Sequence, residues 1–343
     1  MPSPELSVLI CTCRRPEGLR QVLTDLAACR GREGLSWEVV VVDNAPAPEV
    51  EAVVAGFRET LPVRYVPEPR RGVSDARNRA VAESQGETVW FLDDDLRVSP
   101  GWLQAAVAAL RAHPRTAVFV GRITPRYVGG EPPAWLSEEP FRSALAFGPT
   151  GRCELGETWG DAPVEYLFGA NLGLRRDAFR ECGVFRTDFG TAPGWLRGEE
   201  HEFYVRLQDA GHRGRYVHDA AVEHLVPADK LTLGFVLGVS YQSGRASANS
   251  RMIRRQRLGR HTLLRRLRDL AWSSAEVAWR TAAAGVLGWF LGAGRRVRAW
   301  MDCAMAIGRM VGCMDRGHDL ALDWPAKSSE AAPEAVPAYL RRK

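Results

Sequence analysis

Short apolar runs alternate with helical segments over the first 120 residues, and this alternation constrains the fold more than any other feature. The apolar runs have the length of buried strands and cover residues 6–12, 37–43, 63–66, 87–92 and 116–120. The helical segments lie between them and cover residues 16–29, 48–59, 72–84 and 102–112. This order predicts an α/β fold, in which a Rossmann-like, mostly parallel sheet carries helices on both faces.

The alternation ends near residue 123, where the organisation of the chain changes. We expect a first unit over residues 1–125 and a second, loop-rich unit over residues 126–230. From residue 231 the chain is rich in Arg, Ala and Leu, which predicts a helical C-terminal region over residues 231–330. Residues 331–343 are expected to be a frayed tail.

The cysteines and the apparent absence of a targeting segment indicate a cytoplasmic protein. Seven cysteines are scattered without CxxC pairs, so neither a zinc site nor a disulfide framework is predicted. The N-terminus lacks the basic region of a secretory signal. The longest uncharged apolar stretch, residues 281–294, is too short to cross a bilayer as a helix. We therefore expect a cytoplasmic chain that is either soluble or peripheral on the inner face of the plasma membrane.

Three consecutive aspartates, Asp93, Asp94 and Asp95, directly follow the apolar run 87–92. Adjacent carboxylates repel one another, and a bound cation offsets that cost. Oxygen ligands suit Mg²⁺ or Mn²⁺, and α/β sheets bind ligands at the carboxyl ends of their strands. The alternative is an acidic turn that caps the next helix, but Ser99 already occupies the capping position. The motif therefore predicts a divalent metal site.

A basic segment, residues 70–79 (RRGVSDARNR), precedes the aspartates and opens a helix. Guanidinium groups bind phosphate oxygens in a bidentate manner, and a helix N-terminus attracts anions. The alternative is an amphipathic helix with a solvated arginine face. Next to an acidic metal site, the segment predicts a diphosphate held between metal and arginine.

Six motifs follow one another between residues 5 and 250. They are Thr12-Cys13-Arg14-Arg15-Pro16, Asp43 after the second strand, Ser74-Asp75-Ala76-Arg77-Asn78, Asp93-Asp94-Asp95, Gly169-Ala170-Asn171-Leu172-Gly173-Leu174-Arg175-Arg176 and Gly198-Glu199-Glu200-His201-Glu202-Phe203. In this order they resemble the motifs of family 2 glycosyltransferases, which have the GT-A fold. The resemblance implies that residues 1–125 bind a nucleotide-sugar and that residues 126–230 bind the acceptor.

The resemblance also implies roles on the donor side. Asp43 would contact the nucleotide base, and Arg77 would face the nucleotide or its diphosphate. The residues expected to contact the nucleotide are Thr12, Arg15, Asp43, Arg77, Asp93 and Asp94. Asp95 would bind the metal, with Asp93 and His224 as further ligands. For His224 the alternative is a purely structural histidine.

On the acceptor side, the resemblance places the catalytic base at Glu200, with Glu199 as the competing assignment. Such a base would remove the proton of an acceptor hydroxyl, so that direct attack inverts the anomeric carbon. Asn171 belongs to the acceptor-side motif. Trp135 and Trp195 are candidates for stacking on a sugar ring, and ordinary packing is the alternative for both.

The C-terminal region is strongly basic. Residues 251–343 hold 18 Lys and Arg against 8 Asp and Glu, and eight of the arginines lie between residues 251 and 269. A basic amphipathic helix of this kind, followed by tryptophans, predicts contact with an anionic membrane surface through residues 251–300. The alternatives are a soluble helical lid and a contact in a homo-oligomer. No recognised motif supports nucleic acid as the partner.

These features together predict an inverting, metal-dependent glycosyltransferase. Its donor would be a nucleotide-diphospho-sugar, most simply a UDP-sugar, and its acceptor a glycan, a lipid-linked glycan or a natural product. One alternative is a sugar-phosphate nucleotidyltransferase, but residues 11–18 (CTCRRPEG) lack the glycine-rich loop expected after its first strand. The other is an inactive sugar-nucleotide-binding or membrane-associated scaffold, which would not need the carboxylates Asp93, Asp95 and Glu200.

Overall fold

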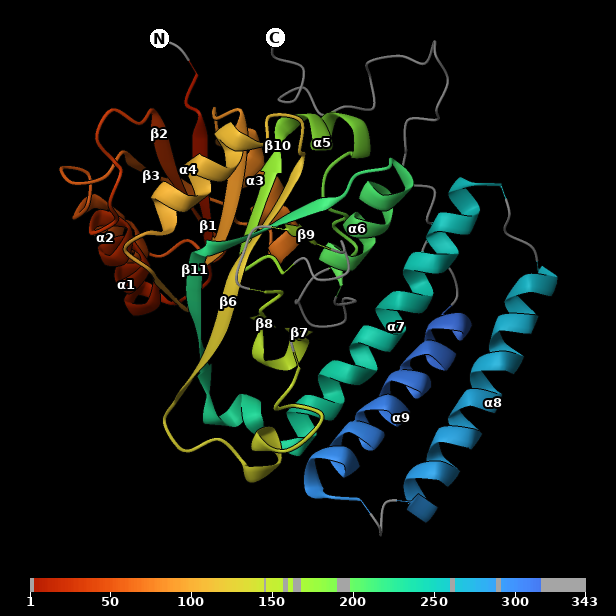
Figure 1. Cartoon of the computed structure of the whole chain (residues 1–343). Coiled ribbons are helices and arrows are strands. Elements are labelled where there is room, and N and C mark those ends of the chain that lie inside the picture. Colours follow the sequence, from red (N-terminus) through yellow and green to blue (C-terminus); the bar gives the residue numbers. More distant parts are fainter. Residues whose placement is uncertain are drawn as a thin grey trace.

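A mixed sheet organises the first part of the chain, and three long helices follow it (Figure 1). The computed structural model describes residues 3–144, 146–156, 160–162, 168–189, 198–259, 263–287 and 291–315. The strands in this part of the chain are β1 (Leu6–Thr12), β2 (Trp37–Asp43), β3 (Val63–Pro67), β4 (Thr88–Asp93), β5 (Leu96–Val98), β6 (Val118–Val128), β7 (Ala146–Phe147), β8 (Arg152–Cys153), β9 (Gly160–Ala162), β10 (Asn171–Arg175) and β11 (Gly214–Pro227). The helices of the sheet region are α1 (Pro16–Ala27), α2 (Pro48–Ala55), α3 (Val73–Glu83), α4 (Trp102–Ala112), α5 (Arg176–Cys182) and α6 (Glu199–Asp209), with short 3-10 turns η1 (Ala134–Ser137), η2 (Gly148–Thr150) and η4 (Ala228–Leu231).

The first four strands of the sheet are parallel, as the sequence predicts. β1 pairs in parallel with β2 and β4, and β2 pairs in parallel with β3. β10 then enters antiparallel between β4 and β6, whereas β6 and β11 are parallel. The predicted α/β fold is therefore confirmed. The sheet becomes mixed after residue 123 because short strands and loops replace the crossover helices that parallel pairing requires.

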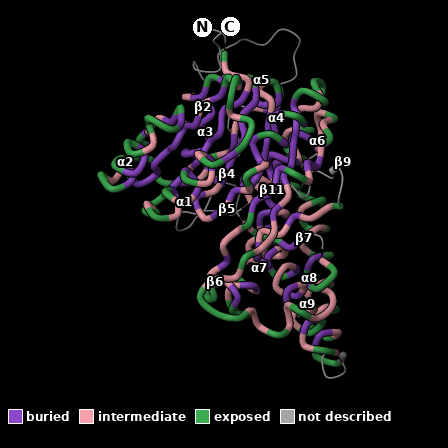
Figure 2. The backbone as a smooth tube through the Cα atoms, turned by 60° about the vertical axis from the view of Figure 1, so that its left-hand side comes forward, coloured by how far each residue is buried: buried purple, intermediate pink, exposed green. Residues whose placement is uncertain are grey.

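The central parallel strands β1, β2 and β4 are largely apolar because they are buried on both faces. Residues 39–42 of β2, all valine, have no exposed surface. The buried backbone is concentrated in the sheet and in the faces of the helices that cover it (Figure 2). The strand register also sets the position of polar residues, since Thr12 lies opposite Asp43 and Cys11 lies opposite Asp93. The carboxyl ends of β1, β2 and β4 therefore meet at one edge of the sheet.

Within the described residues, the predicted helical C-terminal region is confirmed and consists of α7 (Leu233–Arg257), α8 (Leu263–Leu287) and α9 (Ala293–Met314). The rest of that region, 316–330, and the predicted tail, 331–343, lie outside the described residues. α9 lies between α7 and α8 (Figure 1). Small residues bring α7 and α9 close together: a Cβ atom at Gly308 would lie 1.9 Å from the carbonyl oxygen of Tyr241, and one at Gly244 would lie 2.0 Å from that of Met305. In the described part of the chain, no helix is long and apolar enough to cross a membrane.

The close packing of α7 and α9 predicts that Gly308→Ala destabilises the protein. The added methyl group cannot fit against Tyr241 unless the helices separate, and overpacking of this kind costs about 1–3 kcal/mol of unfolding free energy. The matched control is Gly285→Ala in α8, where a Cβ atom would meet nothing within 4 Å and alanine should stabilise the helix by up to about 1 kcal/mol. Urea unfolding measures both, and equal changes in the two variants would contradict the close approach.

Candidate active site

The three aspartates that follow β4 lie at the edge where β1 and β2 also end. The middle one, Asp94, is buried and accepts hydrogen bonds from the hydroxyl group of Thr12 at 2.6 Å and from Arg15 Nη1 at 3.0 Å. The same Arg15 nitrogen lies 3.0 Å from Asp95 Oδ2. Asp94 thus ties the end of β1 to the turn after β4, and Arg15 bridges two of the three carboxylates.

Asp95 is surrounded by basic side chains from three segments of the chain. Besides Arg15, Lys230 Nζ lies 3.4 Å from Asp95 Oδ2, and His224 Nε2 lies 3.5 Å from Asp95 Oδ1. Burial acts to raise the pKa of Asp95, but the hydrogen bond and charge of His224, together with Lys230 and Arg15, hold that pKa far below its usual range. Asp95 is therefore an ionised carboxylate that attracts cations.

The sequence motifs do not indicate Lys230, although the composition does contain a signal for it. Lys230 is the only lysine in the first 326 residues of a chain that otherwise uses arginine. A lysine is a compact point charge on a flexible stem, unlike the planar guanidinium group. The structure places this residue beside Asp95, where it shares the Oδ2 atom with Arg15.

His224 is oriented so that one ring nitrogen faces Asp95. Its Nδ1 atom lies 2.8 Å from the carbonyl oxygen of Thr150, which only accepts hydrogen bonds, so Nδ1 carries the proton. Burial acts to lower the pKa of His224, and the hydrogen bond and charge of Asp95 outweigh it and raise that pKa. In the neutral ring, the lone pair of Nε2 would face the carboxylate, and that arrangement needs a cation between them.

The residues around Asp95 fit a divalent ion as part of its coordination shell. An imidazole nitrogen whose other nitrogen donates to a carbonyl oxygen is the usual form of a metal-ligating histidine. Within the described residues, no group of three or more His, Cys, Asp and Glu side chains could hold a metal ion by itself. Mg²⁺ and Mn²⁺ commonly take one or two carboxylates and complete their shell with water and substrate phosphates, which suits such a partial site.

Asp93 is the last residue of β4 and lies between two groups of opposite effect. Burial raises the pKa of Asp93 to about 6, the negative charge of Asp95 also raises it, and the positive charge of Arg77 lowers it. A carboxyl group in this environment is poised to exchange its proton for another cation.

A buried arginine and two glutamates form the second cluster of the site. Arg77 of α3 is only 5% exposed and donates to Glu199 Oε1 at 2.9 Å and to Glu200 Oε1 at 2.8 Å. Its guanidinium group also lies over the rings of Phe91 and Phe185. The charges of both glutamates raise the pKa of Arg77, so that it stays protonated despite its burial. The first turn of α6 therefore presents two carboxylates to one fixed cation.

Glu200 is the more accessible of the two carboxylates and is suited to proton transfer. Its side chain is 25% exposed, against 8% for Glu199. Burial raises the pKa of Glu200 to about 7; Arg77 lowers it, and the charge of Glu199 adds to the rise. The backbone N–H of Gly169 also donates to Glu200 Oε1 at 2.9 Å. A Cβ atom at residue 169 would lie 2.1 Å from that oxygen and 2.2 Å from Arg77 Nη2, so a side chain here would displace the ends of both residues.

Asp43 is fully buried and shapes the loop that leads into α2. Its two oxygens accept the backbone N–H groups of Ala45 and Ala47, each at 3.0 Å, and the hydroxyl group of Tyr65 at 3.2 Å. The neighbouring Asn44 accepts the N–H of Gly72, which links this loop to the start of α3. Asp43 therefore fixes the backbone of Ala45 and Ala47 at this edge of the sheet.

Asn171 requires a correction, because the structure places it in the core rather than at the acceptor side. It has no exposed surface, and its Oδ1 accepts the indole N–H groups of Trp90 at 2.8 Å and Trp102 at 3.1 Å. Its Nδ2 donates to the carbonyl oxygens of Arg122 and Ala220. Every polar atom of the amide is hydrogen-bonded inside the protein, so Asn171 has none left to contact an acceptor.

Of the two tryptophans predicted to stack on a sugar, only Trp135 lies within the described residues. Trp195 lies outside the described residues. Trp135 is in η1 and packs at 5.0 Å, ring centre to ring centre, against Phe141. This small cluster, which includes Met301 of α9, joins the η1 loop to the helical region. The contacts of Trp135 thus favour the packing alternative.

The position of Asn171 predicts that Asn171→Ala is strongly destabilising. The change would leave two indole N–H groups and two carbonyl oxygens without their partner, which should cost about 3 kcal/mol or more of unfolding free energy. Gln104→Ala, on the exposed face of α4, is the control and should change stability by less than about 0.5 kcal/mol. Denaturant unfolding tests this; an unfolding free energy within about 0.5 kcal/mol of the wild type would contradict the stabilising role of these hydrogen bonds.

Known proteins resemble this chain in sequence and in fold. The sequence profile of glycosyl transferase family 2 matches residues 7–183. The succinoglycan biosynthesis protein ExoM of Rhizobium meliloti is 32% identical over 248 residues, which are 71% of this chain and 75% of that protein. The glucosyl-dolichyl phosphate glucuronosyltransferase of Haloferax volcanii is 25% identical over 225 residues, 64% of this chain and 69% of the other.

Among solved structures, the mannosyltransferase PcManGT from Pyrobaculum calidifontis, in complex with GDP-Man and Mn²⁺, superposes with a TM-score of 0.58. The superposition covers 92% of this chain and 89% of the mannosyltransferase, at 17% sequence identity. This likeness establishes the GT-A fold, which is the fold expected from the motifs.

Proposed function

The chain belongs to glycosyl transferase family 2, and from this premise we propose that it is an inverting, metal-dependent glycosyltransferase. One observation carries the proposal: a cation-collecting carboxylate, Asp95, and a buried arginine–glutamate cluster, Arg77 with Glu200, lie at the same edge of the sheet. A divalent ion held at Asp95 could neutralise a leaving diphosphate, and Glu200 could take a proton. Membership of this family also argues against the nucleotidyltransferase and scaffold alternatives.

On the donor side, we assign the metal to Asp95 and His224, with Asp93 as a further ligand. A divalent ion held there supplies charge neutralisation for the diphosphate leaving group. Arg15 and Lys230, which now contact Asp95, lie where they can pair with phosphate oxygens instead. Thr12 and Asp94 hold the end of β1 in place beside them. We take the donor to be a UDP-sugar, with Asp43 shaping the part of the edge that receives the base.

On the acceptor side, we assign the general base to Glu200. The acceptor oxygen forms a bond to the anomeric carbon as the bond from that carbon to the diphosphate breaks, and the acceptor proton passes to Glu200. Its pKa of about 7 suits this task, because a base works best when its pKa is near the working pH. Arg77 and the N–H of Gly169 fix the position of the carboxylate. A single displacement of this kind inverts the anomeric configuration.

We propose a glycan, and more specifically a lipid-linked glycan, as the acceptor. The Haloferax relative is named for a dolichyl phosphate-linked sugar, and the Rhizobium relative for the biosynthesis of a polysaccharide. A lipid-linked acceptor fits the predicted contact of residues 251–300 with an anionic membrane surface. The enzyme would then work peripherally on the inner face of the plasma membrane.

A donor screen tests the proposal. The purified protein is incubated with UDP-, GDP- and dTDP-sugars, with Mn²⁺ or with EDTA, while melting temperature and nucleotide release are followed. Ligands that bind the native state raise the melting temperature by mass action. A metal-dependent rise with UDP-sugars, accompanied by slow nucleotide release, supports the transferase. No rise with any nucleotide would overturn the donor site.

The assignment of the base predicts that Glu200→Gln lowers kcat by about 10²–10⁴-fold, because the amide cannot accept the acceptor proton. Nucleotide binding, measured by the shift in melting temperature, should be retained. Glu199→Gln is the matched control, since it keeps Glu200 and should lower kcat by less than about tenfold. The reverse order of the two effects would make Glu199 the base.

The pH profile provides a second readout of the same assignment. Glu200 accepts a proton only when it is ionised, so kcat/KM of the wild-type enzyme should fall about tenfold per unit as the pH drops below the pKa of about 7. The residual activity of Glu200→Gln should lack this acid limb. An unchanged limb in that variant would assign it to another group.

The metal assignment predicts that Asp95→Asn weakens Mn²⁺ binding at least about tenfold, because the amide removes the charge that attracts the ion. The Mn²⁺-dependent part of the nucleotide-induced rise in melting temperature should be lost. Glu223→Gln is the control, since Glu223 adjoins His224 on β11 but is an exposed partner of Arg126. Equal Mn²⁺ responses in Asp95→Asn and the wild type would contradict the site.

A further inference from the structure

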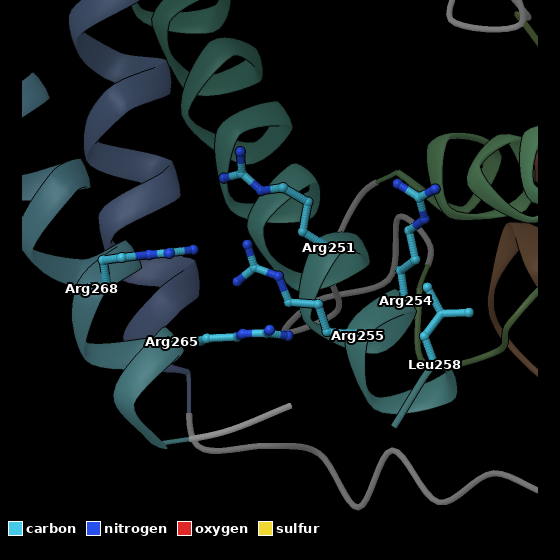
Figure 3. Close-up of a pocket in the computed structure, with 6 residues that line it drawn as sticks. All are labelled: Arg251, Arg254, Arg255, Leu258, Arg265 and Arg268. Atoms are coloured by element: carbon cyan, nitrogen blue, oxygen red, sulfur yellow. The ribbon is translucent and has the colours of Figure 1, made fainter. Parts of the chain in front are cut away.

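An arginine-lined cavity of about 420 Å³ lies between the end of α7 and the start of α8. Its lining consists of Arg251, Arg254, Arg255, Leu258, Arg265 and Arg268. In Figure 3, the side chains of Arg251 and Arg255 extend from α7 toward α8, and those of Arg265 and Arg268 extend from α8 toward α7. We call these six residues the arginine pocket.

Carboxylates compensate only part of the charge of the arginine pocket. Arg254 pairs with Asp209 of α6, and Arg255 pairs with Asp269 of α8. Arg251 and Arg268 have no carboxylate partner in the described ranges. Converging guanidinium groups repel one another, and an anion between them removes that repulsion. Because guanidinium groups match phosphate oxygens in geometry, phosphate is the anion that this pocket suits best.

Helix α8 also presents an apolar face to solvent. Trp272, Trp279 and Val286 follow one another at intervals of seven residues and are 77%, 73% and 68% exposed. Leu264 and Leu267 are 78% and 54% exposed, and they flank the pocket arginines Arg265 and Arg268. α8 lies at the outside of the helical layer, with α9 on its inner side (Figure 1). Large exposed apolar surfaces of this kind mark contact sites.

From this juxtaposition we propose that α8 and the arginine pocket together dock the protein on an anionic phospholipid bilayer. The pocket takes lipid phosphate groups, and Trp272 and Trp279 enter the interfacial layer, where tryptophan is favoured. The purpose of this docking surface rests on the proposed lipid-linked acceptor, whereas the docking itself does not. Trp272 and Trp279 alone would also suit stacking bases, but the exposed aliphatic residues Leu264, Leu267 and Val286 favour a lipid, because a nucleic acid would leave them in contact with water.

The position of the pocket relative to the proposed base is consistent with this role. Ala246 of α7 lies against Gly198 at the start of α6, which carries Glu200. Arg251 and Arg255 are five and nine residues further along α7, roughly 8 and 14 Å along its axis. A glycan that rises from a bilayer at the pocket therefore has a short distance to cover before it reaches Glu200.

The test measures cosedimentation of the full chain with phosphatidylcholine vesicles that contain or lack phosphatidylglycerol. The wild type should prefer the anionic vesicles, and salt should weaken this preference. Arg251→Glu with Arg268→Glu should lower partitioning onto anionic vesicles at least about 30-fold. Trp272→Ala with Trp279→Ala should lower partitioning onto both kinds of vesicle about tenfold.

The matched control is Arg58→Glu with Arg115→Glu, which changes the net charge equally at exposed positions of the sheet region. It should stay within about twofold of the wild type. The docking proposal is overturned if the pocket variant partitions like this control, if the wild type ignores lipid charge, or if a single-stranded oligonucleotide displaces the vesicles.

Nucleotide release from the donor without vesicles separates this proposal from the proposed function. The pocket variant should release nucleotide at the wild-type rate and yet fail to bind vesicles. A wild type that binds anionic vesicles and releases no nucleotide from any donor would leave the docking surface in place and overturn the transferase. The converse result would overturn the docking surface alone.

Discussion

The site depends on one electrostatic constraint, the mutual repulsion of three carboxylates at the end of β4. Each is compensated differently: Asp94 by Thr12 and Arg15, Asp95 by His224 and Lys230, and Asp93 by the charge of Arg77. These partners come from the end of β1 and the turn after it, from α3, from β11 and from η4, and these segments are far apart in the sequence. The fold is thus what makes the aspartate triplet tolerable, and it places beside the triplet the cations that the proposed donor diphosphate would need.

The sequence predicts those features that depend on local signals. The valine run of β2 is continuous because both of its faces are buried, and Asp43 and Asp93 share an edge because parallel strands end together. Asn171 shows the limit of this reasoning. Its position in a motif favours a ligand contact, but only tertiary packing reveals two indole N–H groups that converge on its amide. Lys230 likewise stands out by its rarity alone, since its neighbours form no motif.

Adjacent glutamates present a related limit, because the motif places the base at Glu200 and leaves Glu199 as a competing assignment. The start of α6 separates them: Arg77 binds both, while the N–H of Gly169 reaches only the second. Residue 169 contributes no side chain to this arrangement, and its value lies in the space that it leaves. The sequence motifs cannot predict this effect, because it depends on the absence of a Cβ atom and not on a chemical group.

The continuity of α7 has a consequence for the geometry of the whole enzyme. This helix begins two residues after the η4 turn that carries Lys230, and its 25 residues end at the arginine pocket. At 1.5 Å per residue it holds its two ends about 37 Å apart, and a helix neither stretches nor compresses appreciably. α7 therefore fixes the distance between the η4 turn, which carries Lys230, and the far end of the helical layer. Because this spacing follows from the number of turns, inserting one turn into α7 would move the arginine pocket by about 5 Å relative to Lys230.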